Sequence, residues 1–167
     1  MASRFTRLLR HLFAGPAAAM YPEAGLQRIA AAVAEGEARH RGEICFAVEP
    51  ALPARRVLRG VQARDRAREA FARLQVWDTD ANNGVLVYLL LADHRIEIVA
   101  DRGLAVLVSE QQWRATCVVM EERLRAGEPE AAIVGGVAAI ADLLATHFPR
   151  TPGDADENEL PDLPRVL

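Results

Sequence analysis

A short acidic loop carries the residues of this chain that are best suited to chemistry. Asp78, Asp80, Asn82 and Asn83 precede Gly84, and an apolar run follows at once. Hard cations such as Ca²⁺ and Mg²⁺ prefer carboxylate, amide and carbonyl oxygens, and alternate residues of a tight loop can converge on one ion. The loop therefore predicts a divalent-cation site. The same residues are typical of a turn whose Asp and Asn side chains bond to their own backbone, and this alternative stays open.

The loop differs from an EF-hand calcium loop at two positions. Counted from Asp78, an EF-hand has glycine at the sixth position and a bidentate glutamate at the twelfth. In this chain Gly84 comes one position late and the twelfth residue is Leu89. Any cation site here must have a different ligand set.

A second polar feature is the arginine-rich segment 55–73. It holds seven arginines but only two acidic residues, Asp65 and Glu69. Guanidinium groups bind phosphate and carboxylate well, so the segment could hold phosphate, an acidic lipid head group or an acidic partner. A solvated helix face, partly paired at i, i+4, is the alternative, and the acidic C-terminal tail could also cover the segment. The predicted anion-binding residues are Arg64, Arg66 and Arg68.

Most catalytic motifs are missing from the sequence. All 20 basic residues are arginine, which excludes a Schiff-base lysine and a Walker-A loop. The two serines lie outside any G-x-S-x-G motif, and the four histidines form no H-E-x-x-H pair. Cys45 and Cys117 lie in apolar runs and are predicted to be buried, reduced thiols. No catalytic residue can be assigned from these patterns.

The elements that must position the loop follow from hydrophobic periodicity. The formal charge of −3 over 167 residues argues against nucleic-acid binding, and the length fits one domain. The pattern predicts a buried strand directly after the acidic loop and an antiparallel partner after the break at Asp93-His94. The order predicts an α/β sandwich with a small mixed sheet. The predicted helices are 22–41, 55–76, 109–124 and 129–149, and the predicted strands are 44–48, 85–91 and 95–99.

The N-terminal and C-terminal segments lie outside the predicted α/β domain. Arg7, Arg10 and His11 interrupt the apolar run at the N-terminus. A secretion signal is therefore not expected, and we expect a cytoplasmic location. The N-terminal segment predicts an amphipathic helix that packs on the domain or a partner, or else makes weak peripheral contact with anionic lipid at the inner membrane. The predicted division is a helix at 1–14, a linker at 15–21, the α/β domain at 22–149, and an acidic, proline-containing tail at 150–167 that is extended or disordered.

Several sequence stretches together resemble one known family. The stretch Asn82-Asn-Gly-Val-Leu86 leads into an apolar strand, and Arg95-Ile-Glu-Ile-Val-Ala-Asp-Arg-Gly-Leu104 follows. With 42–48, 76–79 and 158–162, these stretches resemble the soluble bacterial branch of the TPM domain family over residues 22–148. The resemblance implies a three-layer α/β/α fold. Two departures are that Glu23 is the one acidic residue before the first domain helix, and that neither a signal peptide nor a membrane anchor is predicted.

The resemblance also implies functions. Members of the family bind calcium or other divalent cations at acidic loops, some show weak acid-phosphatase activity, and others act as accessory factors of membrane complexes. Carried over, the family's N-N-G turn falls on 82–84 and its Gly-Leu pair on 103–104. The implied ligands of Ca²⁺ or Mg²⁺ are Asp78 and Asp80 with the turn asparagines, and Asp101 approaches from the end of the hairpin.

Two functional hypotheses follow. The first is a cation-binding interaction module that acts as an accessory factor to a protein partner, including a membrane protein. The second is a metal-assisted phosphomonoesterase, in which a cation at Asp78 and Asp80 activates water and Arg66 or a neighbour holds the phosphoryl oxygens.

Overall fold

The computed structural model describes residues 4–151, 153 and 158–167. Its centre is a mixed four-stranded sheet in the order β3-β2-β1-β4. β1 runs parallel to both of its neighbours, whereas β2 and β3 form an antiparallel hairpin. Every residue of β1 and β2 is buried, which explains why both read as continuous apolar runs. The strands are β1 (Glu43–Glu49), β2 (Gly84–Leu90), β3 (Arg95–Ala100) and β4 (Arg165–Val166).

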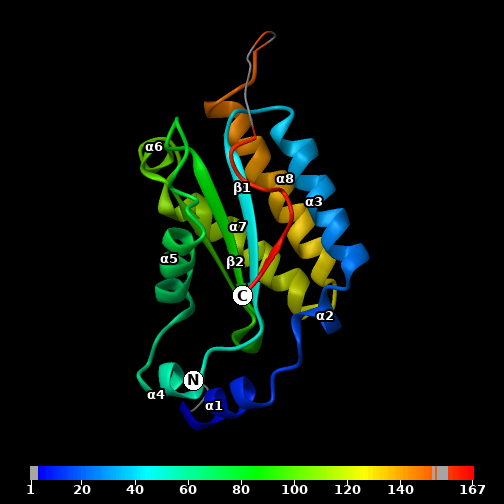
Figure 1. The fold of residues 1–167 in the computed structure, drawn as a ribbon, viewed down its shortest axis with the longest axis vertical. Helices are drawn as coiled ribbons and strands as arrows, with labels where there is room; N and C mark the ends of the chain where they lie inside the picture. Colours follow the sequence, from blue (N-terminus) through cyan, green and yellow to red (C-terminus); the bar gives the residue numbers. More distant parts are fainter. Residues whose placement is uncertain (1–3, 152, 154–157) are drawn as a thin grey trace.

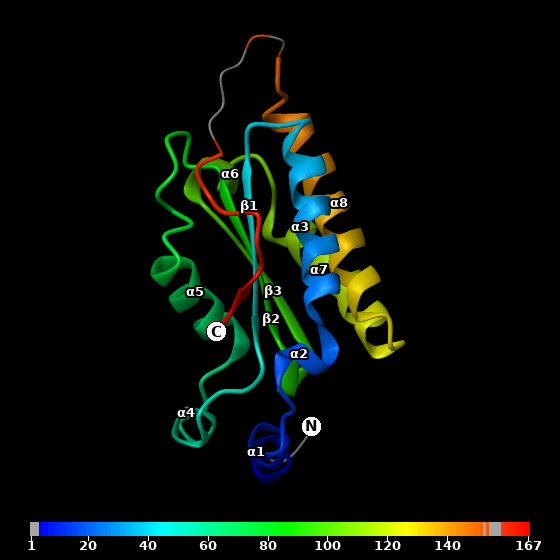
Figure 2. The ribbon, with the colours of Figure 1, turned by 45° about the vertical axis from the view of Figure 1, so that its right-hand side comes forward.

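Helices cover both faces of the sheet, which confirms the α/β/α sandwich (Figure 1). One face carries α3, α7 and α8, and the other carries α4 and α5 (Figure 2). α1 and α4 lie at one end of the molecule and α6 lies at the other. The helices are α1 (Arg4–Leu12), α2 (Ala17–Met20), α3 (Glu23–Glu37), α4 (Ala54–Leu58), α5 (Ala63–Arg73), α6 (Arg102–Ala105), α7 (Glu110–Arg125) and α8 (Pro129–His147).

Strand alternation divides the apolar side chains between two cores. Phe46 and Val87 point into the core beneath α3, α7 and α8, and the Phe46 ring meets Tyr21 edge-on at 5.9 Å. Tyr88 and Leu86 point into the smaller core beneath α5. The sheet is therefore fixed from both sides, and its ends are rigid platforms for the loops that leave them.

α8 packs closely against α7 at Gly136. Among the described helices, α8 is long and apolar enough to cross a membrane by length and composition alone. In this fold its inward face lies in the larger core, in contact with α3 and α7. A Cβ at Gly136 would overlap Met120 of α7. The close approach is therefore between two helices.

Two predicted elements differ from the structure. The predicted helix 55–76 is interrupted between α4 and α5, where Gly60 adopts a φ of +79° and Gln62 and Asp65 form a capping box that starts α5. The predicted linker 15–21 contains α2, and Tyr21 after it is 1% exposed and donates its hydroxyl to the Pro129 carbonyl at 3.1 Å. A run of alanines suits a short helix as well as a linker.

The C-terminal segment joins the sheet through β4. β4 pairs with β1, and the Leu167 amide donates to the Val48 carbonyl at 3.0 Å. Leu160 is buried in the smaller core, and its amide donates to Glu43 at 3.1 Å. The tail thus covers an open edge of β1, which its composition did not indicate.

Candidate cation site at one end of the sheet

The acidic loop and the end of β3 meet at one end of the sheet. β1 and β2 begin there, and β3 ends there because it is antiparallel to β2. The Asp101 amide donates to the Gly84 carbonyl at 2.9 Å, and the Gly103 amide donates to the Asn82 carbonyl at 3.0 Å. The N-N-G turn therefore lies directly against the first turn of α6. α6 is at this end in Figure 1.

Local hydrogen bonds shape the turn. Asn82 has a φ of +51°, a left-handed conformation that asparagine tolerates better than most residues. The Thr79 hydroxyl accepts the Asn83 amide at 3.1 Å. These bonds orient the Asn83 side chain inward, so that this residue is 1% exposed.

Two buried oxygens at this end have no hydrogen-bond partner among the described residues. Asn83 donates its Nδ2 to the Arg41 carbonyl at 2.6 Å, but its Oδ1 accepts nothing. Asp101 caps α6 by accepting the Arg102 amide through Oδ1 at 2.7 Å, and its Oδ2 accepts nothing. A buried acceptor left unpaired costs about 1–3 kcal/mol. Both oxygens are thus free to coordinate a ligand.

The other predicted ligands lie in different surroundings. Asp78 and Asp80 are exposed. The Asp80 amide donates to the Glu159 carboxylate at 3.0 Å, which ties the tail to the loop. Within the described ranges, no group of three or more His, Cys, Asp or Glu side chains could hold a metal ion. A cation here would be held by the Asp101 carboxylate, the Asn83 amide oxygen and water, with carbonyl groups of the turn as further oxygen donors.

A second acidic group at the same end was not predicted. Glu37 of α3 accepts the Ile44 amide at 2.9 Å and lies beside Glu43 and Asp162. Burial, reinforced by these two neighbouring acids and opposed by the Ile44 amide, raises the pKa of Glu37 to about 8. The sequence signal for this group was weak, because its three members come from separate segments.

This raised pKa predicts a pH-dependent stability. Between pH 4.5 and pH 8 the folded protein keeps a proton on Glu37 that the unfolded chain releases, so the free energy of unfolding should fall as pH rises through this window. Glu37→Gln keeps an acceptor for Ile44 and has no proton to lose, so it should flatten the fall. Urea unfolding across the window measures this. Glu35→Gln, an exposed position on the same helix, is the control, and equal slopes in wild type and Glu37→Gln would contradict the assignment.

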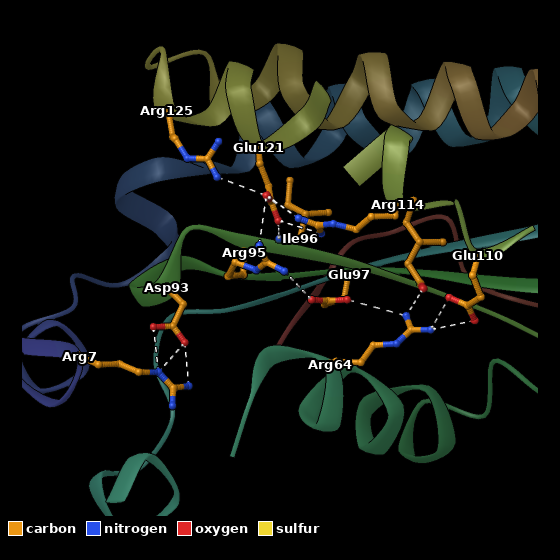
Figure 3. A network of polar contacts seen from close by, with 11 residues as sticks. Arg7, Arg64, Asp93, Arg95, Ile96, Glu97, Glu110, Arg114, Glu121 and Arg125 are labelled. Atoms are coloured by element: carbon orange, nitrogen blue, oxygen red, sulfur yellow. Dashed lines mark hydrogen bonds and ion pairs between the residues drawn. The ribbon is translucent and has the colours of Figure 1, made fainter. Parts of the chain in front are cut away.

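The predicted anion-binding arginines do not converge on this site. Arg66 is 8% exposed, and its Nε donates to Glu49 at 2.7 Å, at the opposite end of β1. Arg64 donates to the Ile98 carbonyl and lies 3.3 Å from Glu110 (Figure 3). Arg68 is exposed. The structure thus places two of the three guanidinium groups in internal contacts.

A buried carboxylate on α7, that of Glu121, is surrounded by arginine side chains. Glu121 is 2% exposed and accepts the Ile96 amide at 3.1 Å. Three guanidinium groups lie within 3.5 Å of its carboxylate, and Figure 3 shows them around it. These belong to Arg95, Arg114 and Arg125. This cluster fastens α7 to the edge strand β3, so its role is structural.

The two thiols are unsuited to catalysis. Cys45 and Cys117 are both buried and unpaired. Burial raises the pKa of each thiol to about 11, so the reactive thiolate is scarce at neutral pH.

Comparison with known proteins identifies the family. The family model of the TPM domain matches residues 18–143. The chain belongs to the TPM domain family. The resemblance drawn from the N-N-G turn and the strands around it is thereby confirmed, and the match covers the whole sheet apart from β4 together with most of α8.

A protein of similar fold has a solved structure for comparison. The NMR structure of the BA42 protein from Bizionia argentinensis superimposes with a TM-score of 0.75 and is 26% identical in sequence. The match covers 86% of this chain and 93% of BA42. No curated protein sequence matched the chain.

Proposed function

We propose that this TPM domain is a cation-binding interaction module whose site is the end of the sheet formed by the N-N-G turn and the start of α6. The observation that supports it most is the pair of unpartnered buried oxygens, Asn83 Oδ1 and Asp101 Oδ2. Oxygen donors of these two kinds suit Ca²⁺ or Mg²⁺. A bound ion would supply positive charge that satisfies both oxygens.

The proposed ion would also connect two surface segments. Trp77 directly precedes the acidic loop and is 47% exposed, and Val106 directly follows α6 and is 85% exposed. Exposed apolar residues beside a polar site are common in protein-binding surfaces. By fixing the loop against α6, a cation would hold these segments in one arrangement, ready for a protein partner.

The placement of the polar residues favours binding over hydrolysis. His94 lies at the far end of β2 from the acidic loop, and Arg66 is held by Glu49 at that same far end. A phosphomonoesterase needs a base and a phosphate-binding cation close to its metal. We therefore expect aryl phosphate hydrolysis at the level of a mock preparation. A rate that collapses in Asp78→Asn or Asp80→Asn would instead support the phosphatase hypothesis.

Thermal unfolding with and without cations tests the proposed site. A ligand at 100 times its dissociation constant adds about 2.7 kcal/mol to folding stability, which raises Tm by roughly 5–10 °C for a chain of this size. We expect such a shift with Ca²⁺ or Mg²⁺ over chelator, and its loss in Asp101→Asn. Asparagine is also a good N-cap, so α6 should persist in that variant.

Two further variants complete the experiment. Asp142→Asn alters a carboxylate on α8 that is 71% exposed and pairs with Arg39, and should keep the full shift. Asp78→Asn should reduce the shift only slightly, because this side chain lies in solvent. The absence of a shift with every ion tried, or an equal shift in Asp101→Asn, would contradict the proposal.

A further inference from the structure

α1 is fixed to the domain through one side only. Arg7 forms an ion pair with Asp93 at 2.8 Å and donates to the Val61 carbonyl at 2.8 Å. His11 is 6% exposed and accepts the Leu52 amide through Nδ1 at 2.9 Å. Figure 3 shows Arg7 reaching from α1 to Asp93 at the turn after β2. These contacts set the rotation of the helix about its own axis.

The opposite side of α1 presents large apolar side chains to solvent. Phe5 is 67% exposed, Leu12 57% and Phe13 81%. We call Phe5, Leu9, Leu12 and Phe13 the apolar stripe. Beside it, Leu9 and Phe13 line a groove of about 830 Å³ together with Met20 of α2, Leu91 after β2 and Leu124 of α7. Adjacent exposed apolar side chains beside a groove are typical of interaction sites.

Positive charge surrounds the apolar stripe. Arg4 and Arg10 of α1 are exposed, and Arg10 also lies 3.4 Å from Asp93. α4, which packs against α1, adds exposed Arg55, and exposed Arg59 directly follows α4. Neither helix contains an acidic residue. The protein as a whole carries a net charge of −3, and the opposite end holds Asp78, Asp80 and the tail carboxylate Glu159. The basic side chains of α1 and α4 thus contrast with the acidic net charge of the protein.

We propose that the end formed by α1 and α4 docks on the surface of an anionic lipid bilayer. The apolar stripe would enter the boundary between head groups and acyl chains, and the arginines would extend to the lipid phosphates. A second copy of the chain is a poorer occupant, because two such ends facing each other would bring arginines against arginines. The proposed cation site lies at the opposite end of the sheet, so this inference is independent of it.

Vesicle co-sedimentation of the full chain tests this docking. We expect binding to phosphatidylcholine vesicles that contain phosphatidylglycerol, little binding to phosphatidylcholine alone, and weakening by salt. Phe5→Ser with Phe13→Ser should lower the partition coefficient at least about tenfold, because two buried aromatic side chains are lost from the bilayer. Both positions are exposed, so the fold should persist in this double variant.

The control variant makes the same kind of substitution, an exposed apolar residue to serine, at the other end of the molecule. Val106→Ser removes an 85% exposed apolar side chain after α6 and should bind vesicles as wild type does. Wild type that fails to bind at every phosphatidylglycerol content, or a double variant that binds equally well, would overturn the proposal. So would a dimer that the double variant abolishes while vesicle binding is absent, since the occupant would then be a second copy.

Discussion

Gly84→Ala is expected to lower the free energy of unfolding by about 3 kcal/mol, the upper range for overpacking a tight site. A Cβ at this position would overlap the Val76 carbonyl oxygen and press on the Val76 side chain. Backbone must move to make room, because the loop before β2 folds back over the start of that strand. The expected fall in Tm is roughly 6–12 °C for a chain of this length, measured by thermal unfolding.

Gly15→Ala is the matched control for Gly84→Ala. No atom lies within 4 Å of a Cβ built at Gly15, so this variant should unfold within about 0.5 kcal/mol of wild type. If both variants were equally stable, the close packing of the loop on β2 would be wrong, and with it the placement of the neighbouring Asn83.

Glu49→Ala should cost about 3 kcal/mol, because it leaves a buried guanidinium without its main partner. Glu49 lies at the end of β1, where its Oε2 accepts Arg66 at 2.7 Å and the Tyr88 hydroxyl at 2.6 Å. Arg66 retains Glu69 at 3.2 Å, which places the cost at the lower end of the range for broken buried pairs. Urea unfolding measures it.

A double variant distinguishes the cost of an unpaired buried charge from the cost of lost packing. Glu49→Leu with Arg66→Met replaces both charges by apolar groups, which is often close to neutral, so it should be clearly more stable than Glu49→Ala. The exposed pair of Arg39 and Asp142 supplies a reference, since Asp142→Ala should cost less than about 1 kcal/mol. A cost for Glu49→Ala no larger than this reference would refute the role of the buried pair.

Hydrophobic periodicity predicted the fold well because the apolar pattern of each predicted strand fits one position in the sheet. A strand that is apolar on both faces, such as 85–90, must lie between two layers, and its order among helices leaves few topologies. The break between α4 and α5 was missed because the segment 55–76 keeps a helical pattern on both sides of Gly60. β4 was missed because a two-residue strand with exposed side chains has no apolar pattern to detect.

The candidate site could be predicted only in part. The oxygen-rich composition of 78–84 identified the loop, and the resemblance added Asp101, which the structure places against the turn. Composition could not show that Asn83 and Asp101 point inward whereas Asp78 and Asp80 point to solvent. Side-chain direction there depends on the Thr79 hydroxyl bond and on the capping of α6, which are tertiary features.

Gly84 also shows how a motif and its physical cause can differ. Glycine in a turn is commonly explained by a left-handed φ, but in this N-N-G turn the left-handed residue is Asn82, with a φ of +51°. Gly84 is required for space, since the Val76 carbonyl occupies the position of its Cβ. The motif therefore fixes the loop tightly onto the sheet end where the cation is proposed to bind.

An amide-resolved NMR titration with Ca²⁺ and Mg²⁺ tests the proposed site most directly. We predict saturable shifts that are largest at Asn83, Gly84 and the Asp101–Gly103 amides, and no change at Leu52 beside α1. Asp101→Asn should abolish these shifts. Titration without any saturable change, or with changes centred on Glu37 and Asp162 instead, would contradict cation binding by Asn83 and Asp101.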